Sequence, residues 1–148
     1  HPARVLSKAV DRLSDAYDLV VVDTPPGPTL VLENLIALAD LALVPVEPTP
    51  LSIRTLAQMQ DFIGERTTNL PLAAFFSLLD ETKVAQRHLY AEYRATDPVF
   101  LTTSIPHSTA VERLGFERRP TVMTSPASLA SRRYRSLWAE VAERIGLD

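Results

Sequence analysis

The sequence contains no cysteine, only four glycines and no long apolar run. Without cysteine the chain can form neither a disulfide framework nor a thiolate metal site. No apolar stretch approaches the roughly 20 residues that a membrane-spanning helix needs. Nothing at the start of the chain resembles a signal peptide. We therefore expect a cytoplasmic protein with no membrane segment.

The rest of the composition is that of an ordinary globular domain. Of its 148 residues, 46% are hydrophobic and 22% are charged, which suits a folded chain rather than a disordered one. This length supports one core, so we expect a single domain over residues 1–148. The formal net charge of −3 argues against a protein coated in positive charge for nucleic acid, but it allows local basic patches.

The most informative stretch is Tyr-Asp-Leu-Val-Val-Val-Asp-Thr-Pro-Pro-Gly, residues 17–27. Its four apolar residues, 19–22, predict a short central parallel strand that is covered on both faces. Asp23 then lies at the carboxyl end of that strand, the edge where open α/β sheets bind ligands. An ionised carboxylate there can hold Mg²⁺ directly or through water. The alternative is a buried strand that ends in a turn, with Asp23 capping the next helix.

The residues after Asp23 suit contact with a phosphate. Thr24 offers a hydroxyl, and Pro25, Pro26 and Gly27 form a stiff turn. The N–H of Gly27 is free to approach a phosphate oxygen, because glycine has no side chain. This combination indicates a nucleotide-dependent switch.

Hydrophobic periodicity predicts helices that alternate with short apolar strands. The expected strands are 19–22, 41–44, 72–79 and 99–105, and the expected helices are 1–16, 29–39, 51–66, 82–94, about 110–114 and 125–146. Pro45, Pro48 and Pro50 predict an extended loop that cannot pair in a ladder. Trp138 is expected in the core. The alternation is typical of an α/β fold with a mostly parallel sheet flanked by helices on both faces.

The stretch at 17–27 resembles the Walker B and switch II segment of the ParA/MinD family of deviant Walker ATPases. Three later segments are similar to other parts of that family, in the same order along nearly the whole chain. Residues 44–48 resemble its P-V-x-P loop, and residues 102–107 resemble the T-x-I-P-R/H loop on the adenine and ribose side. Residues 125–140 resemble its closing helix, with an aromatic at Tyr134 and an acid at Glu140.

The resemblance implies that ATP and Mg²⁺ are the cofactors. Asp23 would be the catalytic and metal-binding residue, and residues 24–27 would sense the γ-phosphate and move on hydrolysis. The implied adenine-side residues are Pro45, Pro48, Ile105, Pro106 and His107, whose alternative interpretation is as plain structural turns.

One part of a P-loop NTPase is missing from the sequence. Phosphate binding in this superfamily needs a glycine-rich loop that ends in Gly-Lys-Thr or Gly-Lys-Ser. Lys8 and Lys83 are the only lysines, and neither follows a glycine. We therefore expect the C-terminal portion of a ParA-like domain, inactive alone, whose exposed sheet edge favours self-association.

Three functions stay open. The first is a ParA-like ATPase that partitions chromosomal or plasmid DNA, or positions another cargo, by ATP-dependent dimerisation with a ParB-like partner. The second is an ATP-dependent amide-forming enzyme similar to cobyrinic acid a,c-diamide synthase or dethiobiotin synthetase, and the third is a degenerate interaction module. Arginines at 118, 119, 132, 133 and 135 could bind DNA non-specifically, or they could simply form a solvated face.

Overall fold

The computed structural model describes residues 2–24, 30–67 and 69–147. The chain divides into two compact units. Unit 1 contains residues 1–42 and 61–71, and unit 2 contains residues 43–60 and 72–148.

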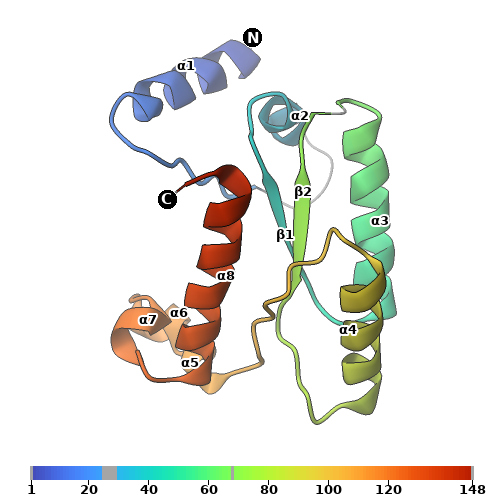
Figure 1. The fold of residues 1–148 in the computed structure, drawn as a ribbon. Coiled ribbons are helices and arrows are strands. Elements are labelled where there is room, and N and C mark those ends of the chain that lie inside the picture. The colour runs from blue at the N-terminus through green and yellow to red at the C-terminus, as the bar shows by residue number, and fades with distance from the viewer. Residues whose placement is uncertain (1, 25–29, 68, 148) are drawn as a thin grey trace. The chain divides into compact units, whose positions relative to one another are not determined.

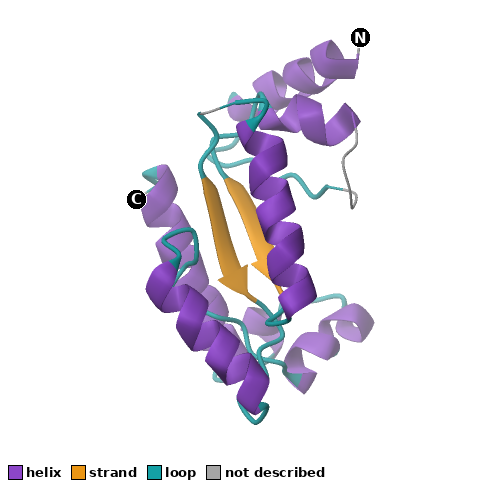
Figure 2. Ribbon diagram, turned by 90° about the vertical axis from the view of Figure 1, so that its right-hand side faces the viewer, coloured by secondary structure: helices purple, strands orange, loops and turns teal. Residues whose placement is uncertain are grey.

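Unit 2 is built around two neighbouring parallel strands, β1 (Ala42–Val46) and β2 (Leu72–Phe76), whose arrows point the same way in Figure 2. The segment 99–106 runs along β2 through two isolated parallel bridges, Ala74 to Phe100 and Leu79 to Pro106. Successive residues of β2 direct their backbone N–H and C=O groups to opposite sides of the strand. One side of β2 therefore pairs with β1 and the other side with this segment, so β2 lies between them.

One face of the sheet packs against α3 (Pro50–Gly64) and α4 (Val84–Thr96), as Figure 1 shows for the part in unit 2. The buried cluster on this face takes side chains from both strands, from α3 and from the 99–106 segment: Val46, Leu56, Ala74, Phe76 and Phe100. The rings of Phe76 and Phe100 stack with their centroids 4.4 Å apart. Stacked aromatic rings of this kind bury a large apolar area and join the segment to β2.

The other face of the sheet carries α8 (Leu129–Ile145), which Figures 1 and 2 place opposite α3 and α4. Ala73 and Phe75 alternate with the cluster residues of β2 and are buried on this side. Leu137 and Val141 of α8 are also buried, one helical turn apart. The predicted α/β fold, with a parallel sheet and helices on both faces, is confirmed.

Three short helices precede α8: α5 (Thr109–Glu112), α6 (Leu114–Glu117) and α7 (Thr121–Thr124). α8 begins where the Ser128 hydroxyl accepts the N–H of Ser131 at 3.1 Å, and it ends at Gly146. Gly146 has a φ of 67°, the left-handed conformation in which many helices end and which glycine adopts at little cost.

Unit 1 contains α1 (Pro2–Ser14) and α2 (Leu30–Ile36), which contact each other. Leu35 and Ile36, at the end of α2, are buried. The carboxylate of Glu33 forms an ion pair with Arg66 at 3.0 Å. This pair connects α2 to the residues that follow α3.

Residues 19–22 do not form the predicted strand. They have no regular secondary structure and belong to unit 1, and Val21 is 82% exposed. A strand needs a neighbour that satisfies its backbone N–H and C=O groups, and among the residues that the structure describes no strand pairs with this segment. The prediction of a buried central strand is therefore wrong for this structure.

Three smaller predictions also need correction. Pro45 lies inside β1, because a proline fits a strand where its missing N–H is not needed by the ladder. Pro50 is the first residue of α3, a position where no helical N–H bond is lost. The 99–105 segment makes only isolated bridges, and Trp138 is 47% exposed rather than in the core.

No helix within residues 2–24, 30–67 and 69–147 combines the length and apolar character needed to cross a membrane.

Candidate functional site

The candidate site in unit 2 is the carboxyl edge of the sheet. The N–H of Ser77 donates to Val46 O at 2.9 Å, so the end of β1 adjoins the end of β2. On the other side of β2, Ile105 N–H donates to Phe76 O at 2.8 Å. The loops that follow β1 and the 99–106 segment therefore leave the sheet at the same edge, on either side of β2.

The loop at 105–107 is held firmly at this edge. Leu79 N–H donates to Ile105 O at 3.1 Å, and His107 N–H donates to Leu79 O at 2.9 Å. Ile105 is 1% exposed, Pro106 is partly buried and His107 is exposed. The backbone is thus fixed while the His107 side chain remains accessible.

His107 faces an acid from the next helix. Its Nε2 lies 3.4 Å from the carboxylate of Glu112, at the end of α5. The Ser108 hydroxyl accepts the N–H of Ala110 at 3.2 Å and caps α5, which fixes where this helix begins. The cap and the contact between His107 and Glu112 together set the course of the chain after the loop.

Pro45, near the end of β1, is exposed, and Pro48, in the loop that follows the strand, is buried. Thr49 then caps α3, because its hydroxyl accepts the N–H of Ser52 at 3.2 Å. The two predicted adenine-side loops thus adjoin opposite sides of β2, and each leads into a capped helix.

Sequence reasoning missed the turn after β2. Leu78 has a φ of 58°, an uncommon conformation for a residue with a branched side chain. Asp80 follows, and its Oδ1 accepts the hydroxyl of Thr82 at 2.6 Å and the Thr82 N–H at 3.0 Å. These bonds to Thr82 lower the pKa of Asp80, and Lys83 at 3.7 Å and His107 favour its charged form further. Asp-x-Thr is a known turn pattern that could have suggested this feature.

Asp23 and Thr24 belong to unit 1, and both are exposed. Pro25, Pro26 and Gly27 lie outside the described residues. An exposed carboxylate fits Mg²⁺, which proteins hold through one or two carboxylates together with substrate phosphates. In the described part of the chain, no group of three or more His, Asp or Glu side chains is arranged to hold a metal.

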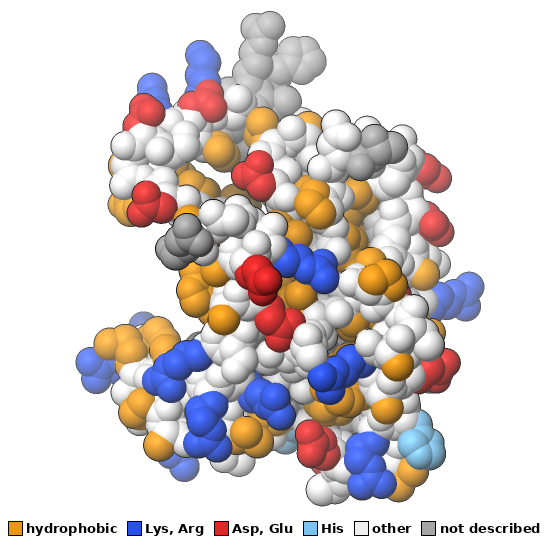
Figure 3. Space-filling view, in the orientation of Figure 1, with side chains coloured by type: hydrophobic (Ala, Val, Ile, Leu, Met, Phe, Trp, Pro, Cys, Tyr) orange, Lys and Arg blue, Asp and Glu red, His pale blue; other side chains and the backbone are white. Residues whose placement is uncertain are grey.

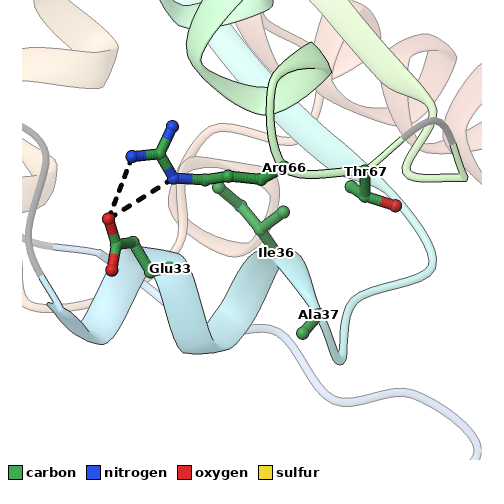
Figure 4. A pocket seen from close by; sticks show the side chains of 5 residues that line it. All are labelled: Glu33, Ile36, Ala37, Arg66 and Thr67. Carbon is green, nitrogen blue, oxygen red and sulfur yellow. Dashed lines mark hydrogen bonds and ion pairs between the residues drawn. The ribbon is translucent and has the colours of Figure 1, made fainter.

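Unit 1 also contains a shallow depression of about 380 Å³. Figure 4 shows the Arg66 side chain reaching past Ile36 to Glu33, with Ala37 and Thr67 completing the lining. The Arg66 guanidinium also donates to Phe62 O at 2.9 Å and lies 3.5 Å from the centroid of the Phe62 ring. Because Arg66 is already engaged by these partners, we assign the depression a structural role.

Comparison with known proteins finds one family model and several ParA family proteins that are similar to this chain. A family model described as an AAA domain matches residues 1–72. The chain is 26% identical over 140 residues to a ParA family protein of Chlamydia pneumoniae, covering 92% of this chain and 55% of that protein. A ParA family protein of Mycoplasma pneumoniae is 24% identical to the chain, and the match covers 98% of this chain and 56% of that protein.

A third relative carries a more specific name. It is a virulence plasmid ParA family protein of Chlamydia psittaci, 25% identical over 146 residues, with 97% of this chain and 56% of that protein covered. The chain thus spans about half the length of the curated relatives it matches.

Proposed function

Since the chain is of the ParA/MinD type of P-loop ATPases, we propose that it is the C-terminal part of a ParA-like nucleotide-binding domain. That ATPase would partition DNA, or position another cargo, by ATP-dependent dimerisation in the cytoplasm. The observation that carries the proposal is the carboxyl edge of the sheet, where the loops after β1 and at 105–107 adjoin the end of β2. Ligands of open α/β sheets bind at this edge.

Each predicted site residue has a role in this proposal. Asp23 holds Mg²⁺ or its bound water, and residues 24–27 sense the γ-phosphate. Pro45, Pro48 and the 105–107 loop line the adenine side. Bound ATP with Mg²⁺ would supply the β–γ phosphoanhydride bond whose hydrolysis to ADP and phosphate releases the dimer. The buried Ile105 suits this role because it keeps the loop rigid while neighbouring groups remain accessible.

The triphosphate needs further residues. No glycine-rich loop with a lysine occurs in the sequence, so the backbone donors and the cation that neutralise the phosphates must come from outside these residues. This chain alone is therefore expected to be inactive.

A DNA partner is supported by the basic side chains near the start of α8. Figure 3 shows basic side chains gathered over the part of the surface that contains α7 and the first half of α8, where the sequence has arginines and no lysine. Arg118, Arg119 and Arg133 form no ion pair with an acid of the described chain. Clustered cations are sufficient for contacts to a phosphate backbone. The name of the Chlamydia psittaci relative, a plasmid ParA family protein, is consistent with such a partner.

Substituting Asp23 tests the proposal. In the full-length protein, Asp23→Ala should lower the ATP hydrolysis rate by at least about tenfold, because Mg²⁺ loses a ligand or its positioning group. Asp18→Ala is the matched control, since Asp18 is an exposed acid of the same segment and should leave the rate unchanged. Equal rates for Asp23→Ala and wild type would contradict the assignment.

The other functions predict different results. Phosphate release that depends on a small carboxylic acid would favour the amide-forming enzyme. Failure of the full-length protein to bind nucleotide would favour the interaction module. Salt-sensitive DNA binding would favour the partition ATPase, because the release of counterions makes such binding depend steeply on salt.

A further inference from the structure

Glu140 of α8 holds the segment that leads into the 105–107 loop. One carboxylate oxygen, Oε2, accepts the backbone N–H of Thr102 at 2.7 Å. The other, Oε1, accepts the hydroxyl of Thr103 in a short hydrogen bond. A single ionised side chain therefore takes two neighbouring donors, and charge-assisted bonds of this kind are roughly twice as strong as neutral ones.

The Thr103 side of these bonds is largely closed to water, whereas Thr102 is exposed. Thr103 is 5% exposed, and Ser104 and Ile105 are buried beside it. Glu140 is itself partly buried. Water therefore competes little for the Thr103 hydroxyl, and loss of the carboxylate would leave a buried donor without its partner.

The same segment is held from two further directions. Ile105 and Leu79 pair it with the end of β2, and the Tyr90 hydroxyl of α4 lies 3.4 Å from Thr102 O. Among the residues that the structure describes, Glu140 is the one charged side chain that holds residues 102 and 103. The carboxylate is therefore the contact that joins α8 to residues 102 and 103, while Arg144 of the same helix donates to Pro98 O just before the segment.

We propose that Glu140 is a positioning residue for the adenine side of the nucleotide site. It fixes the backbone of residues 102–104, so that residues 105–107 keep the position they need beside a bound adenine. This role rests on the proposed function. Through Glu140, α8 would position the 105–107 loop as well as pack against the sheet, because a displacement of the helix at Glu140 would displace the loop.

Hydrogen exchange in the full-length protein tests the contact itself. Glu140→Ala should speed exchange at residues 102–107 roughly tenfold, while residues 72–76 of β2 stay unchanged. Glu140→Gln should give an intermediate rate, because its amide can still accept from Thr102 N–H and donate to the Thr103 hydroxyl. Glu143→Ala is the control, since the carboxylate of Glu143 is exposed and makes no hydrogen bond or ion pair within the described chain. Unchanged exchange in Glu140→Ala, or equal acceleration in β2, would overturn the contact's local role.

Binding of two ligands tests the nucleotide role separately. Glu140→Ala should weaken ATP binding about tenfold and leave inorganic tripolyphosphate binding unchanged, because only ATP uses the adenine side. Partial recovery in Glu140→Gln would support the role. Equal weakening of both ligands, or of neither, would overturn it. If the wild-type protein binds neither ligand, the proposed function and the nucleotide role both fail, while hydrogen exchange still decides whether Glu140 holds the segment.

Discussion

Asp80 is the residue whose environment changes its chemistry most clearly. Two donors from Thr82 reach one carboxylate oxygen, and both favour the ionised form. The pKa of Asp80 is consequently below its ordinary value of 3.8 in the folded chain. Ionised Asp80 therefore stabilises the fold above the unfolded pKa, and this contribution is lost as the pH falls through the lower, folded pKa.

Removal of the Thr82 hydroxyl should raise the pKa of Asp80. Thr82→Val keeps the side-chain shape and the backbone N–H, but it deletes the donor at 2.6 Å, which is the largest cause of the lowered pKa. Carboxyl carbon chemical shifts, followed by NMR from pH 2 to 6, would measure the change. Thr55→Val is the control, because the Thr55 hydroxyl donates to Leu51 O within α3. If the pKa of Asp80 in Thr82→Val equals the wild-type value, the Thr82 hydroxyl does not lower that pKa.

At the scale of elements, the start of α8 depends on one buried hydroxyl. Ser131 is 0% exposed, and its Oγ lies 2.7 Å from Ser125 O and 3.0 Å from Thr121 O. The Ser128 hydroxyl donates to the same Oγ at 2.9 Å. Ser131 therefore connects the start of α8 to the first residue of α7 and to Ser125, which follows α7.

Ser131→Ala should destabilise the fold by about 1 kcal/mol, because the hydrogen bonds of one buried hydroxyl are lost. Chemical denaturation would measure the difference in free energy of unfolding. Ser136→Ala is the matched control, since Ser136 is exposed on the same helix and its loss should change little. If Ser131→Ala lowers the free energy of unfolding no more than Ser136→Ala does, the connection to α7 contributes nothing to stability.

Helices were easier to predict from the sequence than strands. α1, α3, α4 and α8 fall within two to four residues of the predicted ranges, because each carries an apolar stripe that is visible in the sequence alone. A strand depends on a neighbour that can be distant in the chain. Residues 19–22 have strong strand character but no partner strand in the described structure, whereas residues 42–46 pair with β2 despite Pro45.

The candidate site could be predicted only in outline. Motif resemblance pointed to the loops after residues 44 and 104, and these adjoin the same sheet edge. The bonds that hold them were not predictable, because Glu140 and Thr103 lie 37 positions apart in sequence. The Leu78 backbone was missed for a different reason: left-handed φ values are expected at glycine, and no glycine signals this turn.

At the scale of the whole molecule, the exposed segment 19–22 has the strongest consequence. Leu19, Val21 and Val22 are all more than one third exposed, and no β-ladder within the described residues uses their backbone groups. An apolar segment of high strand propensity whose backbone is not used in a ladder can add a strand to another chain. We therefore predict that the chain self-associates.

A charge at the most exposed position should weaken this association. Val21→Lys places an ammonium group where Val21 is 82% exposed, so it should leave the fold intact while opposing strand addition. Sedimentation velocity over a range of concentrations should show a concentration-dependent shift for the wild type and a smaller shift for Val21→Lys. Leu51→Lys is the control, because Leu51 is 74% exposed but lies on α3. If Leu51→Lys reduces association as much as Val21→Lys does, general surface hydrophobicity causes the association rather than strand addition at residues 19–22. A wild-type protein that sediments as a monomer at every concentration would contradict the prediction of self-association.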